Sequence, residues 1–234
     1  KQLCQAQAER QRQLAVLLDP DKVENQNWAH LVRGIQQAGA TQILVGGSRV
    51  VAQCGQRLID YLHQHLSIPV ILFPGDPSQL YPNADALLLL NLVSGRNPDY
   101  LIGLHVQAAQ VLRNASFEIW PTGYLLIDGG RETAVQRVSQ TTPLSQQNIE
   151  LIVNTAIAAE LNGAQCIYLE AGSGALYPIS VEIIQAVRAA VNLPLWVGGG
   201  LRSREAVEAA YRAGATGVVI GTAFENDLNF FAYG

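Results

Sequence analysis

Three glycine-rich loops in the last third of the chain could hold a phosphate group. Residues 171–174 follow the apolar run 167–169 and Glu170, and glycines at 198–200 and 221 also follow β-type runs. Glycine leaves backbone N–H groups accessible, and several of them together surround an anion, aided by helix dipoles. A single such loop often only shapes a turn. Three of them, each at a strand end, predict one phosphate held from three sides.

Asp19 and Ser48 each follow a short apolar run, at the places where a barrel carries its chemistry. A carboxylate and a hydroxyl, completed by waters and phosphate oxygens, suit Mg²⁺. The alternative is that both side chains only cap the helices that follow, and the spacing does not decide between the two. Asp21 is a possible second ligand, although a turn residue beside Pro20 is the simpler interpretation.

Glu170 ends the run 167–169 directly beside the predicted phosphate loop. A carboxylate there would repel phosphate unless it serves another part of the ligand, for example by taking the proton of a substrate hydroxyl. The alternative is a structural ion pair with an arginine such as Arg202. Tyr168 alternates onto the same face as Glu170, so it points into the same site or is a core tyrosine. The other tyrosines and tryptophans considered are interpreted as packing residues: Tyr81, Tyr100, Trp120 and Tyr124.

Strands and helices that could position these residues alternate along the chain. Apolar runs predict strands at residues 14–18, 43–45, 69–73, 86–90, 124–127, 166–169, 195–197 and 217–220. Helical patterns separate them, including residues 98–113, 146–161, 180–191 and 203–213. The connection 74–83 is rich in Pro, Gly and Asp and is a poor helix, and 129–143 reads as a long surface connection.

This alternation predicts an α/β fold in which residues 1–234 form one (β/α)8 barrel with an irregular or missing third helix. A doubly wound open sheet is the rival fold. The two glycine sites near the C-terminus favour the barrel, because the loops after its seventh and eighth strands commonly bind phosphate.

Composition excludes several classes of function. With 49% hydrophobic and 15% charged residues, the 234-residue chain can bury a large core. The net charge of −4 argues against nucleic-acid binding. Lys1 and Lys22 are the only lysines, so a Schiff-base aldolase is not expected. Cys4, Cys54 and Cys166 read as reduced thiols of a cytoplasmic protein, and no transmembrane segment or signal peptide is visible. The chain begins without Met, so its true N-terminus is expected upstream.

Several motifs together resemble geranylgeranylglyceryl phosphate synthases, a family that includes the bacterial heptaprenylglyceryl phosphate synthases. They are Leu-Leu-Asp-Pro-Asp-Lys at 17–22, Val-Gly-Gly-Ser at 45–48, Ser-Gly-Arg-Asn-Pro-Asp-Tyr-Leu-Ile-Gly at 94–103, Tyr-Leu-Glu-Ala-Gly-Ser-Gly at 168–174, Gly-Gly-Gly at 198–200 and Gly-Thr at 221–222. The likeness covers nearly the whole chain. Some bacterial members carry Lys two places before the first metal Asp. Leu17 stands there in this sequence, which therefore looks like the branch without that lysine.

The resemblance implies a modified TIM barrel that uses Mg²⁺ to join sn-glycerol 1-phosphate to a polyprenyl diphosphate. This forms the first ether bond of archaeal-type lipids. By position, Asp19 and Ser48 match the metal ligands, while the catalytic role expected of Glu170 rests on its place beside the phosphate loop. The glycerol-phosphate site corresponds to Tyr168, Leu169, Glu170, Ala171, Gly172, Ser173, Gly174, Gly199, Gly200, Gly221 and Thr222. The resemblance further implies a homo-oligomer, either dimer or hexamer, and a transient contact with a membrane surface for product release.

Two rival functions remain open at this stage. One is another phosphate-binding barrel enzyme, such as an isomerase or a flavin-phosphate enzyme, which would use the same glycine loops. The other is a barrel that binds a phosphate ligand without catalysis. The combination of Asp19, Ser48 and Glu170 favours the prenyltransferase, because the rivals need neither a diphosphate-bound cation nor a site for a C20 chain.

Overall fold

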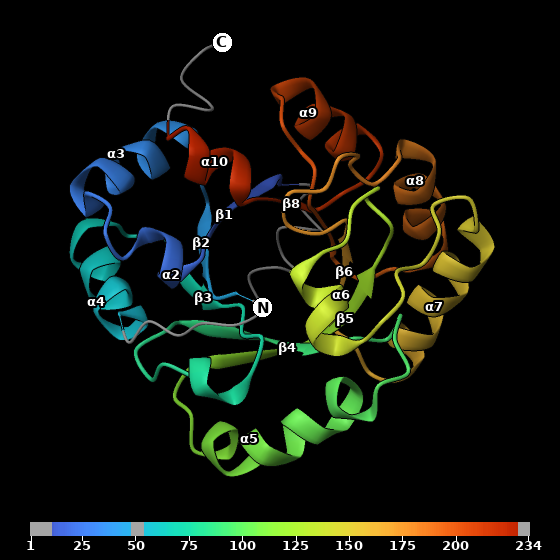
Figure 1. The fold of residues 1–234 in the computed structure, drawn as a ribbon, viewed down its shortest axis with the longest axis horizontal. Coiled ribbons are helices and arrows are strands. Elements are labelled where there is room, and N and C mark those ends of the chain that lie inside the picture. Colours follow the sequence, from blue (N-terminus) through green and yellow to red (C-terminus); the bar gives the residue numbers. More distant parts are fainter. Residues whose placement is uncertain (1–10, 48–53, 229–234) are drawn as a thin grey trace.

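Eight parallel strands close into a barrel in the computed structural model, which describes residues 11–47 and 54–228 (Figure 1). In chain order the strands are β1 (Gln13–Leu18), β2 (Gln42–Val45), β3 (Val70–Leu72), β4 (Ala86–Asn91), β5 (Glu118–Leu126), β6 (Cys166–Glu170), β7 (Leu195–Gly198) and β8 (Gly217–Ile220). Each strand pairs with the next, and β8 pairs with β1, with Ile220 opposite Val16. The predicted (β/α)8 barrel is confirmed, and the open sheet is excluded.

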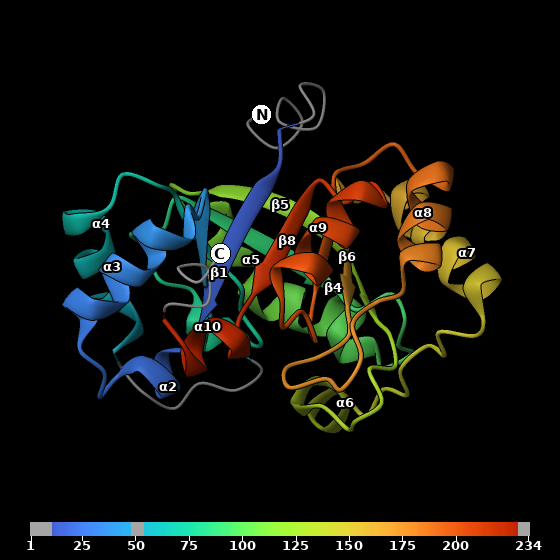
Figure 2. The same ribbon diagram turned by 90° about the horizontal axis from the view of Figure 1, so that it is seen from above.

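Helices cover the outside of the barrel and connect its strands (Figure 1). The longer ones are α3 (Trp28–Ala38), α4 (Gly55–His65), α5 (Leu104–Arg113), α7 (Ile149–Leu161), α8 (Val181–Ala190) and α9 (Arg204–Arg212). A π-helical turn, η2 (Asp99–Gly103), leads into α5. The short helices α2 (Pro20–Val23), α6 (Ala134–Ser139) and α10 (Thr222–Asn226) lie together at the end of the barrel where the strands have their carboxyl ends (Figure 2).

The third helix is reduced to one short 3₁₀ turn, as predicted. Between β3 and β4 the chain forms only η1 (Pro77–Gln79), which begins at a proline and is capped by Asp76, whose carboxylate accepts a bond from the Ser78 N–H. Proline and glycine make this connection a poor α-helix. The connection between β3 and β4 is consequently a loop with one short turn and not a full helix.

Two predicted boundaries were wrong. Strand β5 runs without interruption through Pro121, which lies opposite Leu89 and whose carbonyl accepts a bond of 2.7 Å from the Gln165 N–H. Proline lacks only the donor, so the acceptor side of the ladder survives. The connection after β5 is also not plain surface loop, because α6 forms there with Thr133 as its N-cap. That helix lies over the carboxyl end of the barrel.

The core has two layers, one outside the strands and one inside the barrel. Alternation along each strand sends every second side chain outward against the helices, as for Leu169 and Val197. The other side chains fill the barrel interior, among them Leu44, Trp196 and Tyr168. The interior packing ends near Tyr168, and the inward positions beyond it face the site.

Candidate functional site

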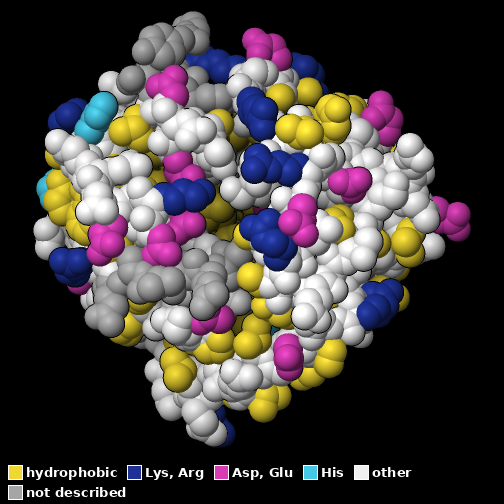
Figure 3. Space-filling model, viewed as in Figure 1, with side chains coloured by type: hydrophobic (Ala, Val, Ile, Leu, Met, Phe, Trp, Pro, Cys, Tyr) yellow, Lys and Arg dark blue, Asp and Glu magenta, His cyan; other side chains and the backbone are white. Residues whose placement is uncertain are grey.

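The carboxyl ends of the strands surround a cavity of about 720 Å³, a size typical of small-molecule sites. Figure 3 shows this face as a central hollow with side chains of both charges around it. The predicted site residues that line it are Asp19, Tyr168, Glu170, Gly172, Ser173, Gly174, Gly199, Gly200, Gly221 and Thr222. Residues from β1, β6, β7 and β8 therefore meet at one place.

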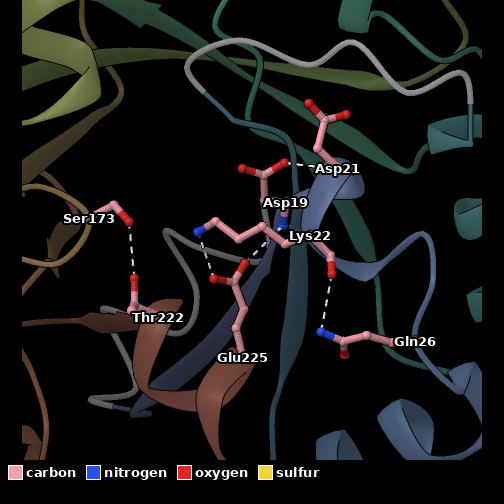
Figure 4. A network of polar contacts seen from close by, with 7 residues as sticks. All are labelled: Asp19, Asp21, Lys22, Gln26, Ser173, Thr222 and Glu225. Atoms are coloured by element: carbon pink, nitrogen blue, oxygen red, sulfur yellow. Dashed lines mark hydrogen bonds and ion pairs between the residues drawn. The ribbon is translucent and has the colours of Figure 1, made fainter.

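The three glycine loops are in contact with one another. The hydroxyls of Ser173 and Thr222 lie 3.0 Å apart, which joins the loop after β6 to the start of α10 (Figure 4). Gly199 has φ +82°, and a Cβ there would lie 2.5 Å from Glu170 Oε1 and 2.6 Å from the Gly172 nitrogen. No other residue fits this approach, because a side chain would collide with fixed atoms. The glycines thus make room for a group that binds to backbone N–H donors.

Glu170 is buried at the base of this cavity. Its Oε1 accepts a bond of 2.5 Å from the Gly172 N–H. Burial raises the pKa of Glu170 to about 7, although the Gly172 N–H and the Tyr168 hydroxyl act in the opposite direction. The Tyr168 hydroxyl is itself buried and makes no hydrogen bond of ordinary geometry within the described chain. A carboxylate with a pKa near neutrality can gain and lose a proton under physiological conditions.

The alternative pairing of Glu170 with Arg202 does not occur. The Arg202 guanidinium instead donates to the backbone carbonyls of Gly174, at 3.3 Å, and Ala175, at 2.8 Å. It therefore holds the glycine loop after β6, and it also lines the cavity. Within the described chain no cation forms an ion pair with Glu170, so its carboxyl is available to a ligand.

Leu169 and Ala171 do not line the cavity, in contrast to the prediction from the motif. Both are fully buried in the layer between strands and helices. The alternation that points Tyr168 and Glu170 inward necessarily points Leu169 and Ala171 outward. The Ala171 N–H is also used, because it donates to the Gly198 carbonyl at 3.0 Å. These two residues support the site without facing its ligand.

Asp19 also lines the cavity, in a network of charged groups (Figure 4). Its Oδ1 caps α2 by accepting from the Asp21 N–H at 3.1 Å. Its backbone N–H donates to Glu225 Oε1, and Lys22 pairs with Glu225 at 2.8 Å. Burial raises the pKa of Asp19, and the Lys22 ammonium acts against this. Both interpretations of Asp19 thus remain compatible, since capping uses one oxygen and leaves the other.

The donor set beside Asp19 fits a cation that arrives with a phosphate ligand. Asp19 Oδ2 lies close to Gly47, 3.0 Å from the place of a Cβ there. Ser48, the other predicted metal ligand, lies outside the described residues. Residues 11–47 and 54–228 contain no group of three or more His, Cys, Asp or Glu side chains that could hold a metal alone. Mg²⁺ is commonly held by one or two carboxylates with substrate phosphates and water, which this arrangement permits.

A second, apolar cavity of about 100 Å³ adjoins the first. It lies between β4, η1 and α5, where the third helix is reduced, and its lining includes Leu80, Leu88, Leu104 and Leu112. The two cavities share lining residues: Gly47, Phe73, Tyr124, Val135 and Val138. A ligand with a polar head and an apolar tail can therefore extend from one into the other.

Sequence reasoning missed two residues of this site. Tyr124, interpreted as packing, does pack, with its ring 5.4 Å from that of Tyr168 and 6.0 Å from that of Phe73, but it also lines both cavities. The Glu225 side chain is nearly buried and links Lys22 to Asp19, although Glu225 lies more than 200 residues further along the chain than either. The available signal was strand parity for Tyr124, which shares a face with Leu126. Nothing local marked Glu225.

A sequence model of the PcrB family matches residues 6–232. The chain belongs to the PcrB family. Among its relatives, the geranylgeranylglyceryl phosphate synthase of Flavobacterium johnsoniae is 51% identical over 231 residues, covering 99% of this chain and 95% of that protein. The protein of the same name from Korarchaeum cryptofilum is 39% identical over 219 residues, covering 94% and 90%.

The fold agrees with this membership. The structure of (S)-3-O-geranylgeranylglyceryl phosphate synthase from Thermoplasma acidophilum, in complex with sn-glycerol 1-phosphate, superposes with a TM-score of 0.89. The two sequences are 28% identical, and the match covers 99% of this chain and 93% of that one. In the described part of the chain, none of the helices combines the length and apolar character needed to cross a bilayer.

Proposed function

We propose that this chain is a prenyltransferase that joins sn-glycerol 1-phosphate to geranylgeranyl diphosphate, forms an ether bond and releases diphosphate. This is the first ether bond of an archaeal-type lipid. The observation that carries the proposal is that a polar cavity lined by glycines, Glu170 and Asp19 adjoins an apolar cavity. Similarity to synthases of that name supports the same substrates.

The glycine loops after β6, β7 and β8 bind the phosphate of glycerol phosphate. Their backbone N–H groups and the paired hydroxyls of Ser173 and Thr222 supply donors of a kind that suits phosphate oxygens. Held there, the glycerol extends toward Glu170. Fixing the acceptor hydroxyl in this way converts an encounter between two substrates into a reaction between neighbours.

Glu170 takes the proton of the acceptor hydroxyl. As the glycerol oxygen forms its bond to the allylic C1, the bond from C1 to the diphosphate oxygen breaks, its electrons leave with the diphosphate, and the hydroxyl proton passes to Glu170. With a pKa of about 7, the carboxyl accepts this proton readily and releases it again to solvent. The Gly172 N–H holds one carboxyl oxygen and orients the other.

The rings of Tyr124 and Phe73 line both cavities, where the reacting carbon would pass from the apolar to the polar one, and Tyr168 packs against them on the polar side. Positive charge that develops on an allylic carbon is attracted to aromatic faces. Phe73 completes this cluster at 5.4 Å from Tyr168. These residues also separate the reacting centre from the barrel interior.

Asp19 and Ser48 would hold Mg²⁺. When bound, Mg²⁺ neutralises the diphosphate and makes it a better leaving group. Asp19 would supply one carboxylate oxygen to the ion, since its other oxygen caps α2. The Lys22 ammonium lies 2.8 Å from the Glu225 carboxylate and balances its negative charge beside Asp19.

The proposal extends to the setting in which the enzyme works. Cys54 and Cys166 are buried as thiols and not as a disulfide, which supports a reducing cytoplasmic location. Exposed apolar side chains such as Ile102, Val106 and Leu161 support a surface for further copies, as a dimer or hexamer, or for transient contact with a membrane when product leaves.

Radiolabelled sn-glycerol 1-phosphate, geranylgeranyl diphosphate and Mg²⁺ test the reaction directly, with sn-glycerol 3-phosphate in parallel. We expect label to enter the organic phase with the 1-phosphate alone. No transfer with any donor length, despite binding of glycerol phosphate, would instead support a non-catalytic barrel. Conversion of a phosphorylated sugar or flavin precursor in its place would support the other rival.

A further inference from the structure

Gln79, at the end of η1, holds the backbone of one residue by both of its hydrogen-bonding groups. The Gln79 amide oxygen accepts from the Gly47 N–H at 3.1 Å, and the amide nitrogen donates to the Gly47 carbonyl at 2.9 Å. Only 1% of Gln79 is exposed. A buried amide with both groups satisfied fixes its partner closely, because breaking either bond leaves a buried polar group unpaired.

Gly46 and Gly47 are confined from the other sides as well. Gly46 has φ +151°, and a Cβ there would collide with the Phe73 carbonyl at the end of β3. A Cβ on Gly47 would meet the Asp19 carboxylate at 3.0 Å. The two glycines that follow β2 are thus in close contact with Asp19 after β1, with Phe73 after β3 and with Gln79. The reduced third helix contributes the residue that closes this contact.

We propose that Gln79 is a positioning residue for the diphosphate half of the site. It holds the Gly47 peptide against Asp19, so that this side of the cavity is formed before the prenyl diphosphate binds. This inference rests on the proposed function. Pro77 and Leu80, on either side of Gln79, line the apolar cavity. The same turn therefore shapes the apolar cavity and fixes the diphosphate half of the site.

The test replaces Gln79 by Met, which keeps the length of the side chain and removes both hydrogen bonds. Thr41→Val is the matched control. The Thr41 hydroxyl accepts from the Leu14 N–H at 3.0 Å and donates to the Leu14 carbonyl at 3.1 Å, which is the same reciprocal contact at the opposite end of the barrel. Gln79→Glu is the second variant, since a buried carboxyl that stays protonated can accept from the Gly47 N–H and donate to its carbonyl, at the cost of burying an ionisable group.

The readouts are calorimetric binding of an unreactive thio-analogue of geranylgeranyl diphosphate with Mg²⁺, binding of sn-glycerol 1-phosphate, and thermal stability. For Gln79→Met we expect the dissociation constant of the analogue to rise by about tenfold, the cost of a lost buried hydrogen bond. The dissociation constant of sn-glycerol 1-phosphate should stay within about twofold of the wild-type value. For Gln79→Glu, the dissociation constant of the analogue should lie between those of Gln79→Met and the wild type. Thr41→Val should lose stability to a similar degree and bind both ligands as the wild type does.

Unchanged binding of the analogue by a folded Gln79→Met would overturn the inference. The inference would also be overturned if Gln79→Met weakened the binding of both ligands equally, or if Thr41→Val weakened binding of the analogue as much. Gln79 would then act only through the stability of the fold. If Gln79→Met does not fold, Gln79→Glu decides by the same comparison. A wild-type protein that binds no prenyl diphosphate at all refutes the proposed function itself, which is a distinguishable result.

Discussion

The two halves of the site present different chemical groups to a ligand. The half formed by the loops after β6, β7 and β8 presents backbone N–H groups, and its shape depends on glycines such as Gly199 that tolerate no side chain. The half around Asp19 presents charged side chains, with Lys22 and Glu225 in balance. A backbone site is rigid and insensitive to pH, whereas a site of carboxylates responds to protons and cations. This difference suits a constant phosphate on one side and a diphosphate that must leave on the other.

Glu170 borders the backbone half, where its Oε1 accepts from the Gly172 N–H, and its replacement should have the largest effect. Glu170→Gln keeps an acceptor for the Gly172 N–H and removes the base, so kcat should fall by about 10³-fold. Binding of sn-glycerol 1-phosphate, measured by calorimetry, should change by less than about twofold. A variant with wild-type turnover would remove Glu170 from the mechanism.

The rate should also depend on pH through the same residue. Because the base works only when ionised and its pKa is raised to about 7, kcat/KM for the prenyl diphosphate should rise between pH 5 and pH 8 by about 100-fold and level off above. Substrate ionisation contributes to the same curve, so the Glu170→Gln profile serves as the reference. Identical profile shapes for the two proteins would contradict the assignment.

The backbone half can be tested by Gly199→Ala. The added methyl would lie 2.5 Å from Glu170 Oε1, so we expect the dissociation constant of sn-glycerol 1-phosphate to rise by about 30-fold as the loops move apart. Gly39→Ala is the control, since Gly39 has φ +66° but no atom within 4 Å of its Cβ position. It should lose about 1 kcal/mol of stability through backbone strain and keep its affinity. Equal affinities in both variants would show that the close approach is not needed.

The charged half should give the smallest of these changes. Asp19→Asn keeps an oxygen that can cap α2 and removes the negative charge, so the Mg²⁺ concentration at half-maximal rate should rise by about tenfold. Binding of sn-glycerol 1-phosphate without Mg²⁺ should be unaffected, because that ligand belongs to the other half. An unchanged Mg²⁺ titration would leave Asp19 as a helix cap alone.

Much of the fold could be predicted from the sequence because its signals are local. Apolar runs alternating with helical patterns predicted the barrel, and the prolines and glycines of residues 74–83 predicted the reduced third helix. Boundaries failed where a local rule was overruled, as at Pro121, where neighbouring strands on both sides hold β5 together. The glycine loops and Glu170 could be placed at the site because each lies at the carboxyl end of a strand.

Only the closed barrel decided which side chains meet. Parity of β6 placed Leu169 and Ala171 outside the cavity, and closure of β8 onto β1 brought Glu225 to Lys22 and Asp19. Packing between neighbouring strands and their connections placed Tyr124 at the junction of two cavities and Gln79 on Gly47. The sequence by itself determined which groups lie at strand ends, since that depends on neighbours along the chain. Their pairing across the barrel depends on strand register and on contacts between distant segments, which no local pattern encodes.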